Sequence, residues 1–343
     1  MKYKFFANSQ KSWKAMFDAI YSAKKSIYIE MYIFQSNIRE FNFFNLLKEK
    51  AENGMKIKMV LDSYGSASLH KDEIAILKNA GIELLFLSYF FHRTHRKIII
   101  TDEDTAFIGG VNIYEDSSLW NDLVVRVKGR LVQSIIRSFS KVYIECGGKD
   151  TDVTEHYQNK PKRKMRDWLV EHFPTKKEFE FKQVYREHIL QAKKHIIIVT
   201  PYLSPKRWLI SLLHQAHLRG VKIEILVPRS TDSNMVNRLN YFYINKLHDL
   251  GVTFFLQDKM NHAKIMLIDS KEAIVGSQNL DFFSFEMNHE VGIFFQNMEA
   301  IGRINRIINE WKIGAPLFAK ADYKRDWVDY IIVPIFRMLV RII

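Results

Sequence analysis

The 343-residue chain repeats itself once, and this duplication restricts its possible folds more than any other feature. Three segments of the first half recur in the same order in the second half: 23–29 as 192–198, 53–57 as 219–223, and 80–82 as 250–252. The offsets, measured at Ala23, Gly54 and Gly81, are 169, 166 and 170 positions. A repeat of this kind predicts two similar halves rather than two unrelated domains.

Both halves show the same alternation of helical and strand-like segments. Helices are predicted at 10–23, 42–53, 183–194 and 207–219, and strands at 27–34, 56–61, 196–202 and 222–227. Such alternation is typical of α/β proteins. We therefore expect an α/β fold of two similar halves, each a mostly parallel sheet flanked by helices, packed as a pseudo-twofold pair. The apolar segment Ile82 to Phe91 is too short to span a membrane and predicts a buried strand.

The repeat divides the chain into a first half (1–146), a polar connection (147–182), a second half (183–312) and a C-terminal segment (313–343). The connection carries the basic run Lys160 to Arg166 and is predicted to be a linker or surface insertion. Trp168 and Leu169 follow it, which leaves membrane contact open. The C-terminal segment is apolar but interrupted by charges. It predicts an amphipathic tail that either lies in a membrane interface or packs on the body as a last helix.

Charge and composition limit the classes of partner. The net charge of +13 favours polyanions, either nucleic acid or an anionic membrane surface. Cys146 is the only cysteine, so no internal disulfide can form and a reducing compartment fits. The N-terminus lacks the apolar core of a secretory signal. No segment reaches the roughly 18 uninterrupted apolar residues expected of a membrane-spanning helix.

Each half contains the same polar motif, His-x-Lys-x4-Asp, followed at one spacing by Gly-[Gly/Ser]-x-Asn. The first copy is His95, Lys97, Asp102, Gly109, Gly110 and Asn112, and the second is His262, Lys264, Asp269, Gly276, Ser277 and Asn279. Corresponding residues are 167 positions apart throughout. A single short motif arises by chance, but two copies with one spacing do not.

The spacing inside the motif separates chemical from structural residues. Positions two apart on a strand share a face, so His95 and Lys97 are expected to point the same way. Asp102 lies an odd number of residues after His95 and is expected to face away, in a structural role. The small residues of the motif are expected to let the backbone and an Asn side chain approach the site closely. The residues assigned to this structural group are Asp102, Asp269, Gly109, Gly110, Gly276 and Ser277.

This motif is the signature of the phospholipase D superfamily, which the sequence resembles from about Phe5 to about Asn297. Within that superfamily it is most similar to the short-form bacterial cardiolipin synthases. The resemblance includes the segments 28–34, 62–66, 201–202 and 279–281. Long-form members carry N-terminal membrane helices, which this chain does not show. Phe283 stands where members usually have Arg, and this departure affects the substrate assignment more than the reaction class.

The resemblance implies a two-histidine mechanism without a metal or another cofactor. One histidine attacks phosphorus and forms a phosphohistidine, while the other exchanges a proton with the departing and incoming alcohols. We assign His95 as the nucleophile and His262 as the acid/base, although the near-symmetry of the halves leaves that order open. The residues expected to bind the phosphoryl oxygens are Lys97, Lys264, Asn112 and Asn279.

A catalytic imidazole needs a hydrogen-bond partner on its second nitrogen. Two acids stand at matching places, with Asp122 27 residues after His95 and Glu290 28 residues after His262. We expect them to orient the catalytic imidazoles; the alternative is that they are ordinary acids at strand ends. The residues expected to line the substrate pocket are Tyr64, Ser66 and Tyr202.

The leading hypothesis is a membrane-associated phosphatidyltransferase that makes cardiolipin from phosphatidylglycerol. It implies an anionic phospholipid partner and a peripheral position on the cytoplasmic face of a bacterial membrane. One alternative is a phospholipase D or a nuclease that uses water as the acceptor, and nucleic acid is the less favoured substrate. Another is a catalytically inactive binding module, which two intact motifs disfavour. The sequence leaves the oligomeric state open.

Overall fold

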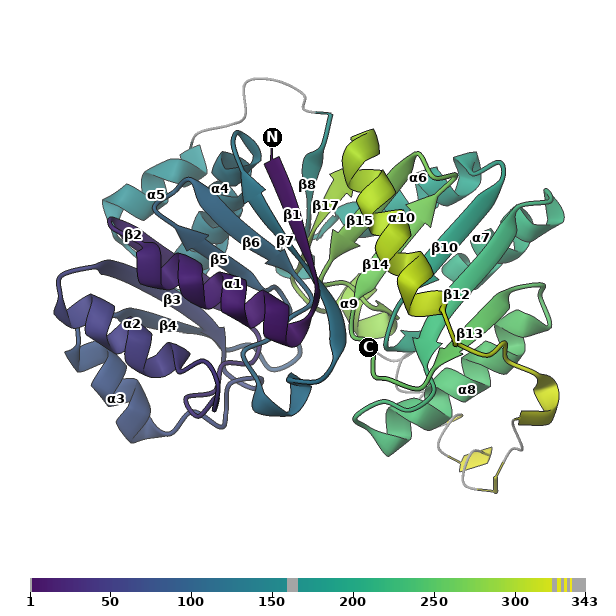
Figure 1. Cartoon of the computed structure of the whole chain (residues 1–343), viewed down its shortest axis with the longest axis horizontal. Coiled ribbons are helices and arrows are strands. Elements are labelled where there is room, and N and C mark those ends of the chain that lie inside the picture. Colours follow the sequence, from purple (N-terminus) through teal and green to yellow (C-terminus); the bar gives the residue numbers. More distant parts are fainter. Residues whose placement is uncertain (1, 159–165, 323–325, 328–329, 332–333, 335–343) are drawn as a thin grey trace.

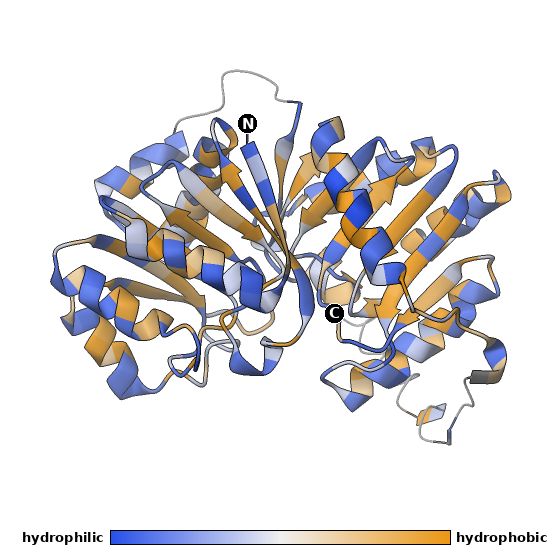
Figure 2. Cartoon of the chain, viewed as in Figure 1, coloured by the Kyte–Doolittle hydropathy of each residue, from blue (hydrophilic) through white to orange (hydrophobic). Residues whose placement is uncertain are grey.

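The computed structural model describes residues 2–158, 166–322, 326–327, 330–331 and 334 (Figure 1). Two halves lie side by side, each built on one sheet with helices on both faces. Most of the strand residues in the middle of both sheets are apolar, while the helices carry many polar residues (Figure 2). The α/β class and the two similar halves predicted from the sequence are therefore confirmed.

The first sheet has seven strands in the order β1-β7-β6-β5-β2-β3-β4. Their bounds are β1 (Lys2–Asn8), β7 (Asn121–Lys128), β6 (Thr105–Gly109), β5 (Ile98–Thr101), β2 (Ser26–Met31), β3 (Lys56–Asp62) and β4 (Glu83–Leu87). The three strands β2, β3 and β4 are parallel, and every other neighbouring pair is antiparallel.

The second sheet has eight strands in the order β13-β12-β10-β14-β15-β17-β8-β9. Their bounds are β13 (Thr253–Gln257), β12 (Lys222–Pro228), β10 (His195–Val199), β14 (Lys264–Ile268), β15 (Glu272–Gly276), β17 (Glu290–Phe295), β8 (Trp168–Phe173) and β9 (Glu178–Phe179). Here too only three strands, β10, β12 and β13, are parallel. A separate pair joins β11 (Leu203–Ser204) to β16 (Leu280–Asp281).

The prediction of mostly parallel sheets is therefore wrong, because both sheets are mixed. Parallel strands need long crossover connections, and only the helix-linked part of each half provides them. The motif strands β5 and β14 instead turn back directly into β6 and β15 through short hairpins. A short hairpin joins antiparallel strands only, so the motif itself imposes the antiparallel part of each sheet.

Helices cover the outer faces of the sheets, and two further helices help to fill the space between the sheets. The outer helices are α1 (Ser9–Ser22), α2 (Phe43–Glu52) and α3 (Lys71–Asn79) in the first half, and α6 (Glu180–Gln191), α7 (Arg207–Leu218) and α8 (Asn234–His248) in the second. The inner helices α4 (Leu131–Glu145) and α10 (Met298–Lys312) contribute to one apolar core shared by both halves. This shared core, which includes Val127 and Ile293, fixes the halves against each other.

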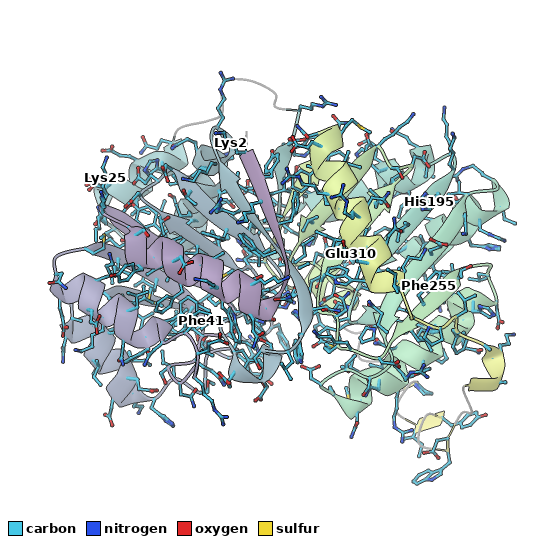
Figure 3. All side chains as sticks on the ribbon, viewed as in Figure 1. Lys2, Lys25, Phe41, His195, Phe255 and Glu310 are labelled. Atoms are coloured by element: carbon cyan, nitrogen blue, oxygen red, sulfur yellow. The ribbon has the colours of Figure 1, made fainter. Side chains whose placement is uncertain are left out.

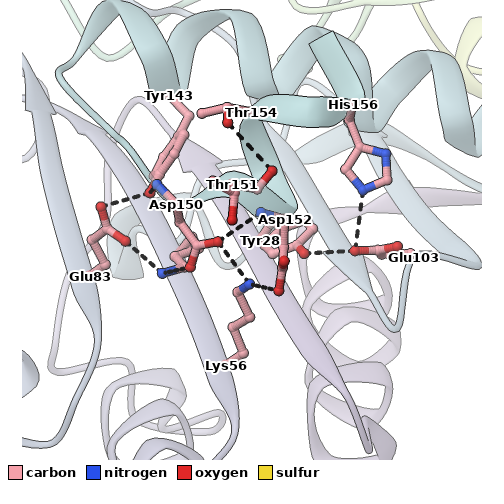
Figure 4. Close-up of polar contacts among 11 residues, drawn as sticks. Tyr28, Lys56, Glu83, Glu103, Tyr143, Asp150, Thr151, Asp152, Thr154 and His156 are labelled. Carbon is pink, nitrogen blue, oxygen red and sulfur yellow. Dashed lines mark hydrogen bonds and ion pairs between the residues drawn. The ribbon is translucent and has the colours of Figure 1, made fainter. Parts of the chain in front are cut away.

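The connection 147–182 is structured over much of its length. Its helix α5 (Thr151–Gln158) packs on α4, and Asp150 forms ion pairs with Lys56 (3.0 Å) and Lys58 (2.6 Å) of β3 (Figure 4). Asp152 pairs with Lys56 at 2.6 Å. Strand β8 is hydrogen-bonded to β17 and thus belongs to the second sheet. These parts of the predicted linker or insertion are thus regular elements packed on the two halves, while 159–165, which hold most of the basic run, lie outside the described residues.

The structure also bears on the predicted strand at 82–91 and on the predicted C-terminal tail. The predicted buried strand Ile82 to Phe91 ends as β4 at Leu87, where its partner β3 also ends at Asp62. The aromatic residues after it are exposed rather than buried. Of the predicted amphipathic tail (313–343), residues 323–325, 328–329, 332–333 and 335–343 lie outside the described ranges. Within those ranges no helix is long and apolar enough to cross a bilayer.

Candidate active site

The two motif histidines lie at the boundary between the halves. His95 precedes β5 and His262 precedes β14, so both sit just before the regular ladder rather than in it. The backbone N–H of His95 donates to His289 O (3.0 Å), and that of His262 donates to Asn121 O (2.7 Å). Each motif is thereby joined to the backbone of the other half.

Each histidine is paired with a carboxylate from the other half. His95 Nδ1 lies 3.0 and 3.2 Å from the two carboxylate oxygens of Glu290, and His262 Nδ1 lies 2.9 Å from Asp122 Oδ2. The matching distances along the sequence link each acid to the histidine of its own half, but the structure pairs them across the boundary. All four side chains are buried. Neither half alone therefore holds a complete His–carboxylate pair.

Each of the two acids lies at the start of a strand. Asp122 is the second residue of β7, and Glu290 is the first residue of β17. Isolated backbone bridges join Asn121 to Asn261 and Thr94 to His289, which are the residues just before the acids and the histidines. The acids come beside the histidines because these bridges tie the start of each acid strand to the opposite motif.

The motif lysines are buried beside the histidines. Lys97 Nζ donates to His95 O at 2.6 Å, and Lys264 Nζ donates to His262 O. Burial lowers the pKa of Lys97 well below its ordinary value and lowers that of Lys264 to about 8. Two lysine side chains held in one buried site provide N–H donors for the oxygens of an anion.

Burial and the lysine charges keep both imidazoles neutral at rest. Burial lowers the pKa of His95 well below its ordinary value, and the charges of Lys97 and Lys264 lower it further. Burial, followed by the charge of Lys264, lowers the pKa of His262 to about 4. In a neutral imidazole whose Nδ1–H donates to a carboxylate, Nε2 carries the free lone pair. Each histidine is therefore arranged to act as a base or nucleophile through Nε2.

The two carboxylates have different surroundings. The hydroxyls of Ser277 and Ser284 (2.7 Å) donate to Glu290, and burial raises the pKa of Glu290 to about 7 despite the opposing charge of Lys97. Asp122 instead lies against Gly110, where a Cβ would come within 2.2 Å of Asp122 Oδ1. Ser277 and Gly110 occupy equivalent motif positions. At this position the serine donates a hydrogen bond to Glu290, whereas the glycine leaves space for the Asp122 carboxylate.

The two motif asparagines are buried in unlike settings. Asn112 Oδ1 accepts from Ile33 N at 3.2 Å, so its amide N–H groups remain as donors. Asn279 Oδ1 has no hydrogen-bond partner within the described residues. Both asparagines lie on the chain segment that follows β6 or β15, two residues after Gly110 or Ser277.

The motif aspartates bind backbone rather than facing the histidines. Asp102 accepts from the N–H groups of Lys24, Lys25 and Ser26, and Asp269 accepts from those of Lys193, Lys194 and His195. Figure 3 shows Lys25 and His195 on opposite flanks of the molecule, each at the start of an inner strand. The two aspartates thus fix the same turn in both halves. Both adopt positive φ, 52° and 51°, which Asp tolerates better than most residues.

The predicted pocket residues have different positions. The Tyr202 ring lies 5.9 Å from the His262 ring, and its hydroxyl donates to Asp232 at 2.9 Å. Ser66 is buried, and its hydroxyl donates to Tyr32 O and accepts from Phe34 N. It therefore supports the backbone rather than presenting its hydroxyl to a ligand. Tyr64 is largely exposed, with the Arg93 guanidinium 4.8 Å from its ring.

Two aromatic residues at the site were missed by the sequence argument. The Tyr32 ring lies 5.1 Å from the His95 ring, and Lys97 Nζ lies 5.0 Å from the same Tyr ring. The Trp120 ring lies 5.5 Å from that of His262. Tyr32 directly follows β2, within the segment 28–34 that carries the family resemblance, and this was the signal for Tyr32. Trp120 had no such signal. In the described part of the chain, no three His, Cys, Asp or Glu side chains are grouped to hold a metal ion.

A network of buried charged residues beneath His95 was also missed. Arg96, between the two motif residues, pairs with Glu30 of β2 at 3.2 Å and donates to Ser138 at 2.7 Å. Thr94 Oγ1 donates to Glu30 at 2.5 Å, and Thr94 N donates to Asp62 at 2.9 Å. This network holds the segment before His95 in place.

Comparison with known proteins gives the same assignment as the motif. The family model described as "Cardiolipin synthase, PLD-like domain" matches the chain twice, over residues 16–143 and 185–311. A cardiolipin synthase of Clostridium perfringens is 32% identical over 323 residues, covering 87% of this chain and 67% of that protein. Probable cardiolipin synthase YwiE of Bacillus subtilis is 29% identical over 317 residues, covering 87% and 63%. The chain thus spans about two thirds of the length of these relatives.

Solved structures share the fold. Phosphatidylserine synthase from Haemophilus influenzae matches with a TM-score of 0.76 at 16% identity, covering 99% of this chain and 93% of that one. Polyphosphate kinase from Porphyromonas gingivalis matches with a TM-score of 0.63 at 12% identity, covering 100% and 54%. Identities this low show a common fold and no more. The two family matches, however, together cover most of the sequence, and the chain therefore belongs to the phospholipase D-like domain family of the cardiolipin synthases.

Proposed function

We propose that this chain is a phosphatidyltransferase that makes cardiolipin from two molecules of phosphatidylglycerol. The observation that carries the proposal is the crossed arrangement of two neutral histidines, each bonded to a carboxylate of the other half, beside two buried lysines. The names of the relatives from Clostridium perfringens and Bacillus subtilis support the substrate class.

In the first step, His95 Nε2 attacks the phosphorus of one phosphatidylglycerol. A P–N bond forms, the P–O bond to the headgroup glycerol breaks, and His262 gives its proton to the departing alkoxide. Glu290 stabilises the positive charge that develops on the His95 imidazole. Lys97, Lys264, Asn112 and Asn279 would bind the phosphoryl oxygens as negative charge grows on them.

His262 takes up its proton from water when substrate binds. Alone, this imidazole is neutral because burial and Lys264 lower its pKa to about 4. An anionic phosphodiester between the lysines offsets their charges and raises that pKa again. Asp122, 2.9 Å from Nδ1, stabilises the imidazolium that results. Protonation is thereby linked to the presence of the anion that needs it.

In the second step, the headgroup of another phosphatidylglycerol enters. Neutral His262 removes the proton of its hydroxyl, the oxygen attacks phosphorus, and the P–N bond to His95 breaks. Cardiolipin leaves, and both histidines return to their starting states. We place the reaction at the cytoplasmic face of a bacterial membrane, where the net charge of +13 favours anionic lipid.

The products formed from labelled phosphatidylglycerol vesicles test this function. We expect cardiolipin and glycerol in equal amounts, and no cleavage of single-stranded DNA in a parallel reaction. Phosphatidic acid as the main lipid product would replace the transferase with a hydrolase that uses water. Cleavage of DNA without lipid turnover would overturn the lipid assignment altogether.

A further inference from the structure

The pseudo-symmetry of the chain breaks at one place close to the active site. Strands β4 and β13 correspond at an offset of 170, since they begin at Glu83 and Thr253 and end at Leu87 and Gln257. The motifs that follow correspond at an offset of 167, from His95 to His262. The first half therefore carries three additional residues between β4 and its histidine.

The additional residues make this connection aromatic. The first half reads Ser-Tyr-Phe-Phe-His-Arg-Thr over 88–94, while the shorter second connection reads Asp-Lys-Met-Asn over 258–261. We call the segment 88–93 the aromatic loop. Phe90 is 85% exposed and Phe91 is 53% exposed, and their rings contact each other edge to face at 4.6 Å between centroids. Adjacent exposed phenylalanines leave apolar area in contact with water.

Arg93 holds the aromatic loop in its shape. Its guanidinium donates to the backbone oxygens of Tyr89 (2.6 Å), Phe90 (3.3 Å) and His92 (3.1 Å). The same guanidinium lies 4.8 Å from the ring of Tyr64, which is 67% exposed on the neighbouring loop. The loop that carries the exposed rings is thus held by these hydrogen bonds and by the contact with Tyr64.

The aromatic loop is joined directly to the catalytic machinery. It follows the carboxyl end of β4, which pairs with the end of β3 at Asp62. Asp62 accepts from the backbone N–H groups of Tyr64 and Thr94, at 3.0 and 2.9 Å. One carboxylate therefore ties the Tyr64 loop to the residue directly before His95.

We propose that the aromatic loop inserts into the interface of an anionic bilayer and brings the adjoining active site to its lipid substrate. This inference rests on the proposed function, because a lipid phosphodiester must pass from a membrane to a buried histidine. Aromatic side chains favour the membrane interface, and the net charge of +13 favours a surface of anionic headgroups. Arg93 beside the rings adds a cation at the level of those headgroups.

The test compares two double variants that remove exposed apolar side chains. Phe90→Ser/Phe91→Ser changes the aromatic loop, and the control Tyr21→Ser/Leu218→Ser changes side chains that are 67% and 71% exposed at the far ends of α1 and α7. Binding is measured by co-sedimentation with phosphatidylglycerol vesicles. Activity is measured on those vesicles and on short-chain phosphatidylglycerol below its micelle concentration. We expect the loop variant to bind vesicles about tenfold more weakly or worse, with its activity on the soluble lipid and its melting temperature unchanged.

Three outcomes would overturn the inference. They are vesicle binding equal to wild type, an equal loss in the control variant, and a parallel loss of activity on the soluble lipid. If the wild type forms a dimer that the loop variant does not form, and vesicle binding is unchanged, the loop contacts a second copy of the chain instead of a membrane. Absence of cardiolipin formation by the wild type refutes the proposed function instead, and the vesicle-binding comparison still decides the role of the loop.

A Phe90→Trp variant supplies a direct measurement. Vesicles whose acyl chains carry bromine quench the fluorescence of a tryptophan that enters the bilayer. We expect the variant to fluoresce more strongly than the wild type, and we expect brominated vesicles to quench this additional fluorescence. An added signal that they leave unquenched would show that position 90 stays in water and would contradict insertion.

Discussion

The two halves of the active site have the same backbone and different electrostatics. Glu290, which serves His95, is the longer acid and accepts from two serine hydroxyls, whereas Asp122, which serves His262, lies against Gly110. The two halves therefore place their histidines alike, but the carboxylate that is hydrogen-bonded to each histidine differs. Different surroundings for two like residues are what separate a nucleophile from an acid/base.

A second difference between the halves concerns the buried residues next to each motif. The buried pair Glu30 and Arg96 of the first half corresponds to Val199 and Ala263 in the second, at the same places beside the motif. Thus β2 and the first motif are joined by charge, and β10 and the second motif by apolar contact. One backbone arrangement accommodates both solutions, so the charged pair is a feature of the first site and not a requirement of the fold.

The largest expected effect comes from removing either histidine. His95→Ala and His262→Ala should each reduce turnover of phosphatidylglycerol by about 10⁴-fold or more, because each deletes a different step at one site. Product formation measured over hours with purified variants checks this. Near-native activity in either variant would show that the two halves do not share one site.

The next prediction separates the two carboxylates. Glu290→Gln and Asp122→Asn should each lower kcat by about 10²- to 10³-fold, since each histidine loses the charge that stabilises its cationic form. A substrate with a good leaving group, such as a nitrophenyl phosphodiester, needs no proton donor for its first step. Its rapid first burst should therefore survive in Asp122→Asn and be lost in Glu290→Gln. The opposite pattern would exchange the roles of His95 and His262.

Stability tests the charged pair beneath His95. Glu30→Val or Arg96→Met alone should destabilise the fold by about 3 kcal/mol, because each leaves a buried charge without its partner. The double variant, which resembles the apolar second half, should lose clearly less than the sum of the single losses. Urea denaturation of the four proteins measures this. Additive losses would mean that the pair acts as two independent residues.

The smallest expected effect is a pH dependence caused by Lys264. Its pKa of about 8 lies below the ordinary lysine value, so the ammonium is charged below that pH and loses its proton as the pH rises through it. We expect kcat/KM to fall by about tenfold per pH unit above pH 8, since the neutral amine binds the phosphoryl oxygens poorly. The active fraction of a Lys264→Arg variant should decline only at higher pH. A flat wild-type profile between about pH 7 and 10 would remove Lys264 from phosphate binding.

The sequence by itself determined the duplication, the alternating helices and strands, and the residues of the two motifs. These features are local: periodicity and spacing are written into neighbouring positions, as the close match between the predicted strand 56–61 and β3 illustrates. The structural role predicted for Asp102 agrees with its hydrogen bonds to the backbone N–H groups of Lys24, Lys25 and Ser26, but Asp102 lies after the end of β5 with a positive φ, so strand alternation alone does not set its direction.

Only the tertiary structure decided which acid serves which histidine. Asp122 and Glu290 stand 27 and 28 residues after the histidines of their own halves, yet β7 and β17 bring them beside the histidines of the opposite halves. Pairing over 195 and 140 residues depends on how two sheets pack, and no local pattern encodes that. The exposure of Phe90 was hidden for the same reason: an apolar run predicts burial, but β4 ends where β3 ends, and the aromatic residues beyond that point have no sheet to pack on.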